Sequence, residues 1–256
     1  MAGILRGVVP YVCGGKPTLQ GSVTEHQTEQ GVWYFLYTPP RPSTSILYHL
    51  HGAGEIFAFV RKEVYWTAAA LEQAGKSVHI VAPHDVTKFG MWADGKKVRM
   101  ATSVMNDVMP HAERGLVIEK RCIQGFSMGG FGAALLGLRR PDLFSGIVSW
   151  DGALHSWETL TRNRAFIARD QFDNSEAMFD ENSPWKAAEA CPNKNMPVLI
   201  LVGSMPATLE YGRRFHKHLE DSGMQQITLV ETGLIHSLQP FLAAHGQQAT
   251  RFLFGD

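Results

Sequence analysis

The stretch RCIQGFSMGGFGAALLGLRRPDLFSGIVSW, residues 121–150, contains the pattern that decides the fold. An apolar, β-rich run over 121–126 leads into Ser127, which glycines flank in a G-x-S-x-G element. A helix rich in small residues is expected over 128–140, and Pro141 ends it. A strand that turns into a helix within about one residue forces its serine into a strained conformation, which flanking glycines make possible. Because this turn lifts the hydroxyl above the sheet edge at a helix N-terminus, we expect Ser127 to be a nucleophile.

On both sides of this stretch, short apolar strands alternate with longer segments of helical character. The expected strands are 31–38, 45–50, 77–83, 121–126, 144–150, 197–203 and 226–231, and the other expected helices are 61–74, 98–114 with a kink at Pro110, 208–222 and 238–252. This alternation predicts an α/β fold with a mostly parallel sheet that helices cover on both faces. The segment 152–196, before the penultimate strand, interrupts the alternation. We expect it to be an insertion over the carboxyl edge of the sheet, within a single domain of residues 1–256.

The base that a serine nucleophile needs is expected late in the chain. A serine hydroxyl is a weak nucleophile without a base, and in this kind of fold the histidine follows the last strand. The segment TLVETGLIHSLQPF places His236 there, after a turn at Gly233 and before a helix. His155 comes too early in the chain, and His216 and His218 lie on an expected helix as part of a solvated face.

Two backbone amides are candidates for stabilising the oxyanion of the transition state. One is the N–H of Met128, the residue after the nucleophile. The other belongs to the turn His51-Gly52-Ala53-Gly54, where the strand 45–50 ends. Because small residues in that turn let an amide point at a substrate carbonyl, we expect the N–H of Ala53 to be the second donor.

These residues resemble the esterase D-like branch of the α/β-hydrolases, which includes S-formylglutathione hydrolases, feruloyl esterases and mycolyl transferases. The pieces that carry the resemblance are LYHLHGAGE (47–55), WADG (92–95), VMNDVMPHAE (104–113), RCIQGFSMGGFGAALLGLRRPDLFSGIVS (121–149) and NSPWKAAEA (182–190). The resemblance extends over most of the chain, from about residue 31 to about residue 252. It implies the α/β-hydrolase fold and a serine hydrolase that forms an acyl-enzyme without a metal or another cofactor.

The chain departs from the resemblance at the third member of the triad. Members of the branch carry Asp or Glu in the loop after the strand that corresponds to 197–203, within a G-x-x-D piece. Here that piece reads Gly203-Ser204-Met205-Pro206, with proline in the place of the carboxylate. The acid must therefore come from elsewhere, or be absent.

Three explanations remain open for the acid. Asp151 directly follows the strand beside the nucleophile strand, and it keeps the chain order Ser127, Asp151, His236. A triad is defined by its geometry, so an acid on another strand end can serve. Glu210 lies further along the usual loop and is the alternative acid. The third explanation is that Glu231 serves or that there is no acid; the last case makes the protein a catalytically impaired hydrolase fold that binds a partner.

The charge balance and the cysteines exclude several classes of protein. The chain has 24 basic and 24 acidic residues and no basic surplus, which argues against nucleic acid as a partner. The cysteines Cys13, Cys122 and Cys191 form neither a disulfide framework nor a C-x-x-C metal site, and we expect Cys122 to be a small buried hydrophobe. No apolar run reaches the length of a membrane span, and we read no signal peptide at the N-terminus, so a cytoplasmic protein is expected.

Tryptophans are the candidate substrate contacts. Trp92, Trp150 and Trp157 lie on segments that we expect to surround the site, and no charged cluster dominates those segments. We therefore expect Trp92 and Trp150 to bind a neutral, partly apolar small-molecule ester, with hydrolysis as the reaction. The other interpretation of these tryptophans is that they pack in the core. The alternative on the same scaffold is an acyltransferase that passes the acyl group to an alcohol.

Overall fold

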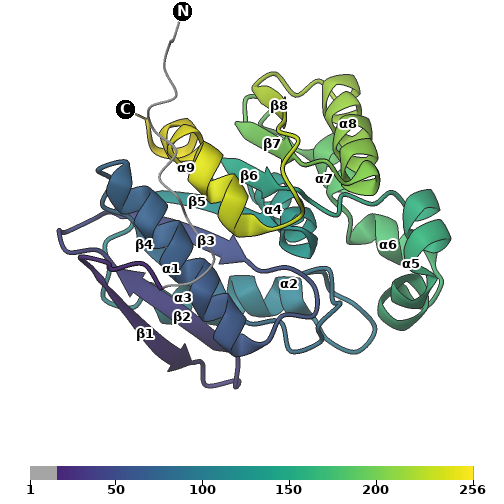
Figure 1. Ribbon diagram of the computed structural model, residues 1–256. Coiled ribbons are helices and arrows are strands. Elements are labelled where there is room, and N and C mark those ends of the chain that lie inside the picture. Colours follow the sequence, from purple (N-terminus) through teal and green to yellow (C-terminus); the bar gives the residue numbers. More distant parts are fainter. Residues whose placement is uncertain (1–15, 256) are drawn as a thin grey trace, which may run out of the picture.

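The computed structural model describes residues 16–255, in which strands and helices alternate along most of the chain (Figure 1). The strands are β1 (Ser22–Gln27), β2 (Trp33–Thr38), β3 (Ser45–Leu50), β4 (His79–Pro83), β5 (Lys120–Phe126), β6 (Ile147–Trp150), β7 (Val198–Val202) and β8 (Ile227–Glu231). The helices are α1 (Phe57–Gln73), α2 (Met100–Ser103), the π-helix η1 (Val104–Val108), α3 (Met109–Ala112), α4 (Met128–Arg139), α5 (Trp157–Phe172), α6 (Glu176–Glu181), α7 (Pro184–Ala190), α8 (Pro206–Asp221) and α9 (Leu238–Phe254). The expectations for Cys13 and for a signal peptide lie outside the described residues.

The strands form one eight-stranded sheet in the order β1-β2-β4-β3-β5-β6-β7-β8. The pairs β1/β2 and β2/β4 are antiparallel, and every pair from β4/β3 to β7/β8 is parallel. The expected mostly parallel sheet is therefore confirmed. None of the helices in residues 16–255 combines the length and the apolar character that crossing a bilayer requires.

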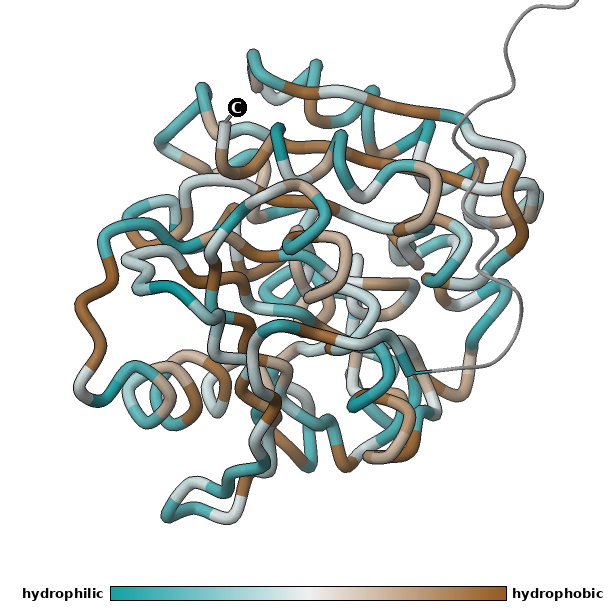
Figure 2. Tube along the Cα trace, turned by 60° about the vertical axis from the view of Figure 1, so that its left-hand side comes forward, coloured by the Kyte–Doolittle hydropathy of each residue, from teal (hydrophilic) through white to brown (hydrophobic). Residues whose placement is uncertain are grey.

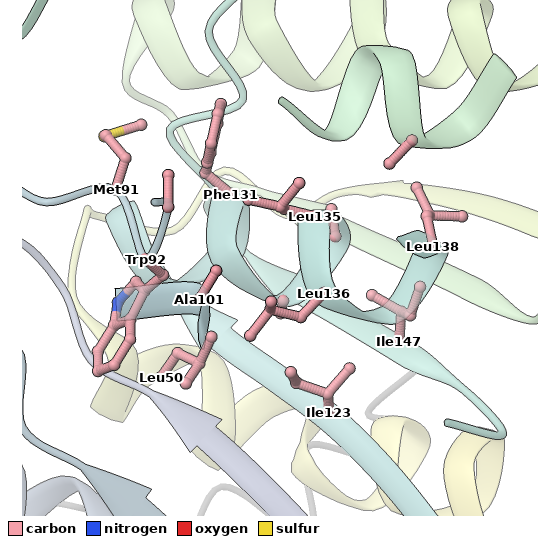
Figure 3. Packing of buried hydrophobic residues seen from close by; sticks show 14 of the residues in the cluster. Leu50, Met91, Trp92, Ala101, Ile123, Phe131, Leu135, Leu136, Leu138 and Ile147 are labelled. Atoms are coloured by element: carbon pink, nitrogen blue, oxygen red, sulfur yellow. The ribbon is translucent and has the colours of Figure 1, made fainter. Parts of the chain in front are cut away.

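Successive residues of the parallel strands pack into two different cores, because side chains alternate between the faces of a sheet. In β3, Ile46 and Tyr48 belong to the core with α4, whereas Leu47 belongs to the core with α1 and α9. Figure 1 shows α1 and α9 side by side over one face of the sheet. In the view of Figure 2, hydrophobic stretches run through the middle of the molecule and hydrophilic ones occupy many of its outer turns. Figure 3 shows the other core, where α4 lies on the strands β5 and β6.

Two local features differ from the expected elements. β1 has no expected counterpart because it is a polar edge strand, SVTEHQ, with no fully buried residue and hence no hydrophobic signal. The expected helix 98–114 is divided into α2, η1 and α3, and its π-helical part ends just before Pro110. Proline has no N–H for the helical hydrogen-bond ladder, and π-turns and prolines are the usual places where a helix departs from regularity.

The parallel strands bring distant residues to one edge of the sheet. Ser127 follows β5, Asp151 follows β6, and His51 follows β3, each at the carboxyl end of its strand. His236 lies between β8 and α9 on the same edge. Carboxyl ends of parallel strands form the usual ligand-binding edge of an open α/β sheet, so the candidate site is built there.

Candidate active site

The turn between β5 and α4 holds Ser127 in a strained conformation. Ser127 has φ 54° and ψ −114° and is the N-cap of α4. A side chain on Gly125 would place its Cβ 2.0 Å from the carbonyl oxygen of Gly129, and a Cβ on Gly129 would lie 1.8 Å from that of Leu50. Only glycine fits at both positions, because backbone atoms cannot move aside as side-chain ends do. The amide of Ser127 donates to the carbonyl of Trp150 at 2.9 Å, which ties the turn to β6.

Three side chains from separate strand ends form a hydrogen-bonded series. His236 Nε2 lies 3.0 Å from Ser127 Oγ, and His236 Nδ1 lies 2.5 Å from Asp151 Oδ2. The imidazole also packs on the ring of Phe126, with 4.8 Å between centroids. Asp151 is fully buried, whereas the side chain of His236 is 29% exposed. The arrangement can move a proton from the serine hydroxyl to an imidazole whose other nitrogen faces a carboxylate.

The backbone around Asp151 fixes the position of its carboxylate. Asp151 has φ 44°, in the left-handed region, and its amide donates to the carbonyl of Leu201 at 2.7 Å. The amide of Gly203 donates to Asp151 Oδ1 at 2.9 Å. Pro206, which stands where the resemblance implies the acid, is the first residue of α8. The loop after β7 therefore contributes a backbone donor to the carboxylate of Asp151, which follows β6.

The other candidate carboxylates lie in surface ion pairs. Glu210 Oε1 is 3.5 Å from Arg162 and 3.6 Å from Arg214. Glu231 Oε1 is 2.6 Å from Arg213. The prediction of Glu210 as the alternative acid, and that of Glu231, is wrong geometrically, since each carboxylate faces arginines rather than His236.

Ala53 and Met128, the expected oxyanion donors, line the same cleft as Ser127 and His236. Met128 is the first residue of α4, and amides in the first turn of a helix have no partner within the helix. Gly54, next to Ala53, is held by a 2.7 Å hydrogen bond from its amide to the carbonyl of Lys88. Both residues of the expected oxyanion hole therefore lie at the cleft that contains Ser127.

Trp150 lies in a buried polar chain beneath the site and not in the cleft. Its indole N–H donates to Gln124 Oε1 at 3.0 Å, which leaves the amide group of Gln124 to donate to His49 Nδ1 at 3.1 Å. His49 Nε2 then donates to Glu63 Oε2 at 2.9 Å. The prediction that Trp150 binds substrate is wrong, because its side chain is fully buried against α9 and its N–H is satisfied inside the protein.

Trp92 is also a structural residue. Its side chain is fully buried beside α4 (Figure 3), and its indole N–H donates to the carbonyl of His51 at 3.1 Å. The ring of His51 packs edge-on against it, with centroids 4.9 Å apart. The prediction of substrate contact is therefore wrong for Trp92 too. The indole of Trp92 instead supports the turn that contains Ala53. Trp157 packs against Phe179.

Four ionisable groups are buried around this turn, and burial keeps them neutral. Burial lowers the pKa of His49 and that of His51 to about 3. Burial raises the pKa of Glu63 to about 8 and that of Glu55 to about 9. The hydrogen bonds of His51 agree with a neutral ring, since Nε2 accepts from the amide of Asp85 and leaves Nδ1 to donate to the carbonyl of Gly52.

These groups predict a stability maximum in mildly acidic solution. As pH falls below the ordinary histidine pKa of 6.5, the unfolded chain takes up protons that His49 and His51 do not bind in the folded state. The free energy of unfolding therefore decreases. As pH rises above the ordinary glutamate pKa of 4.5, the unfolded chain releases protons that folded Glu55 and Glu63 retain, which also costs free energy. For these four groups, the histidine and glutamate contributions cancel between pH 4.5 and pH 6.5, and each group contributes at most about 1.4 kcal/mol per pH unit outside that window.

Urea unfolding at a series of pH values measures this dependence. Between pH 6.5 and about 8, the decline of the unfolding free energy with pH is expected to be about half as steep in Glu63→Gln, which cannot ionise, as in the wild type. Equal slopes in the two proteins would contradict a neutral Glu63 in the folded state.

The cleft above Ser127 has a volume of about 620 Å³, which suits a small molecule. One wall comes from α5 and another from α8 and the loop before it. Besides Ser127, His236, Ala53 and Met128, the lining residues are Phe89, Met91, Ala153, His155, Arg162, Asn163, Arg164, Ile167, Met205, Ala207, Thr208 and Tyr211. The expectation that no charged cluster dominates the site segments did not include Arg162 and Arg164, which both line the cleft.

Sequence reasoning missed the arginines because α5 is broken where they occur. Arg164 has φ −145° and ψ 44°, which is not helical, although the helix continues on both sides. The break contains neither glycine nor proline, the residues that signal an interruption. Figure 1 shows α5 and α6 at the right-hand margin, below α8.

Among residues 16–255, no group of three or more His, Cys, Asp or Glu side chains is arranged to hold a metal ion.

Comparisons with known proteins agree with this fold. A family model described as "Putative esterase" matches residues 32–249. An S-formylglutathione hydrolase from Agrobacterium tumefaciens superposes with a TM-score of 0.72 at 16% identity, covering 93% of this chain and 97% of that one. A fluorophosphonate-binding serine hydrolase, F, from Staphylococcus aureus superposes with a TM-score of 0.76 at 14% identity, covering 92% of this chain and 99% of that one.

A ferulic acid esterase gives a TM-score of 0.70 at 18% identity and covers 92% of this chain and 100% of its own. No curated protein matches the sequence. The α/β-hydrolase fold and the resemblance to the esterase D-like branch are thereby confirmed.

Proposed function

Because this chain belongs to the esterase family, whose model matches most of its length, we propose that it hydrolyses carboxylic esters through an acyl-enzyme on Ser127. The observation that carries the proposal is the series Ser127, His236 and Asp151, with 3.0 Å and 2.5 Å between the successive donor and acceptor atoms. These are the contacts that proton transfer through a serine triad requires. The substrate is a small-molecule ester that fits the cleft above the serine.

The first half of the reaction forms the acyl-enzyme. Ser127 Oγ attacks the ester carbonyl while His236 Nε2 takes the hydroxyl proton. The carboxylate of Asp151 accepts the hydrogen bond from Nδ1–H and stabilises the imidazolium that forms. The amides of Met128 and Ala53 stabilise the negative oxygen of the tetrahedral intermediate.

The second half releases the acid. His236 returns the proton to the departing alcohol, and the acyl group stays on Ser127. Water then enters, His236 removes a proton from it, and its oxygen attacks the acyl carbonyl. Collapse of this second intermediate frees the carboxylic acid and returns the proton to Ser127.

A fluorophosphonate probe tests the assignment of the nucleophile. The serine hydrolase from Staphylococcus aureus binds fluorophosphonate, and a serine activated by His236 is expected to react in the same way. Intact-mass and peptide mass spectrometry should find one label, on Ser127. Ser127→Ala should remove the label and lower kcat on p-nitrophenyl butyrate by at least about 10³-fold.

Ser145→Ala is the matched control, because Ser145 is exposed and does not line the cleft. It should label and hydrolyse as the wild type does. A folded wild-type protein that neither takes the label nor hydrolyses any ester would instead support a hydrolase fold that only binds a partner.

A further inference from the structure

The charged side chains that line the cleft are all basic. None of its lining residues is Asp or Glu, whereas Arg162 and Arg164 both come from the broken part of α5. Asp151 is buried behind His236 and does not line the cleft. The charged side chains that line the cleft therefore carry only positive charge, which the proposed reaction does not use.

The two arginines differ in their partners. Arg162 lies 3.3 Å from Glu158 and 3.5 Å from Glu210, so surface carboxylates offset its charge. Arg164 forms no ion pair with any carboxylate of the described part of the chain. Its side chain donates from Nη1 to the carbonyl of Asn163 at 3.0 Å, and the rest of the guanidinium is available to a ligand.

The break in α5 is fixed in place beside Arg164. Asn163 Nδ2 donates to Tyr211 Oη at 2.7 Å, which joins the broken turn to α8 across the cleft wall. Tyr211 packs in turn on His155, with 4.3 Å between ring centroids. These contacts hold the backbone from which the exposed side chain of Arg164 extends at the wall of the cleft.

His155 does not add to this charge near neutral pH. Burial and, to a smaller extent, the positive charge of Arg164 together lower its pKa to about 4, so the imidazole is neutral. The cationic group that faces the cleft without a protein counterion is thus the guanidinium of Arg164.

We propose that the ester substrate carries a carboxylate, and that Arg164 binds this carboxylate while apolar side chains contact the hydrocarbon between it and the ester. The apolar contacts come from Phe89, Met91, Ile167 and Met205. A guanidinium pairs with a carboxylate through two parallel hydrogen bonds, which gives both strength and orientation. This inference rests on the proposed esterase function. It replaces the expected neutral substrate with an ester that carries one negative charge.

Paired esters that differ by one charge test the proposal. One pair places the charge on the acyl side: mono-p-nitrophenyl glutarate and its methyl-capped diester. The other pair places it on the alcohol side: 3-acetoxybenzoate and its methyl ester. In at least one pair, the wild type is expected to favour the carboxylate by about ten- to a hundredfold in kcat/KM, mainly through KM, since hydrogen bonds to charged groups have that strength.

Arg164→Gln should abolish this preference, and Arg164→Lys should retain part of it. Arg213→Gln removes an equal charge from an exposed ion pair with Glu231 outside the cleft, and it should retain the whole preference. Turnover of the methyl esters without a preference for either carboxylate would overturn the inference and leave the esterase intact. A preference that survives in Arg164→Gln would overturn it as well. No turnover of any ester would overturn the esterase function itself.

Discussion

Asp151→Asn is expected to lower kcat on p-nitrophenyl butyrate by about 10⁴-fold, the effect seen when a triad acid becomes its amide. The amide can still accept the hydrogen bond that the N–H of Gly203 gives to Oδ1. Its NH₂ group then faces His236 Nδ1, where Oδ2 now lies at 2.5 Å. An NH₂ group there makes Nδ1 an acceptor, which puts the ring proton on Nε2 and leaves no base for Ser127.

Glu210→Gln is the matched control, because it makes the same chemical change in the other carboxylate that the sequence suggested. It should keep kcat within a few-fold of the wild type, since Glu210 pairs with arginines at the surface. Steady-state kinetics should be measured beside circular dichroism, so that a misfolded Asp151→Asn is recognised. A larger loss in Glu210→Gln than in Asp151→Asn would exclude Asp151 as the acid.

Gly129→Ala is expected to destabilise the protein by about 3 kcal/mol or more, although alanine is the better helix former. The added Cβ would lie 1.8 Å from the carbonyl oxygen of Leu50 and 2.8 Å from that of His51. Both atoms are backbone, so relief requires α4 to move away from the end of β3. The same movement separates Ser127 from the turn that holds Ala53, and activity should fall with stability.

The control for this variant is Gly146→Ala, which also adds one methyl group beside a sheet strand. There the nearest atom is the end of the Leu253 side chain at 3.0 Å, which can rotate. Urea unfolding should place Gly146→Ala much nearer to the wild type than Gly129→Ala. Equal losses in the two variants would show that the contact with the end of β3 is not what requires glycine.

The parts of the site that sequence could predict are those whose chemistry restricts the chain locally. Ser127 needs close-packed glycines in its turn, and His236 needs a strand, a turn and a helix in that order. The structure brings Asp151 to His236, and the sequence offered Asp151 because it directly follows the strand beside the nucleophile strand. The expectations for Ser127 and His236 depended on neighbours within a few residues, whereas that for Asp151 depended on the adjacency of two strands.

The tryptophans were assigned a wrong role and the arginines were missed, because the roles of both depend on contacts far apart in the chain. An indole near a strand end suits a cleft or a core equally, and the partners of Trp92 and Trp150 lie 41 and 26 residues away. Arg164 occupies a helix break that no local residue signals, and it meets the cleft only because α5 packs near α8. β1 was missed for a simpler reason: a polar edge strand lacks the alternation by which strands are recognised.

The position of Asp151 changes what the segment after β7 has to do. With the carboxylate on β6, the nucleophile and the acid stand on hydrogen-bonded neighbouring strands, and only the amide of Gly203 is required from that segment. The residues at 204–206 therefore need not supply the carboxylate of the triad, whereas position 203 still needs glycine, because a Cβ there would lie 2.4 Å from the carbonyl oxygen of Leu234. A search that recognises active relatives by a carboxylate after β7 would discard chains of this kind as inactive, whereas one that accepts Asp at the end of β6 would retain them.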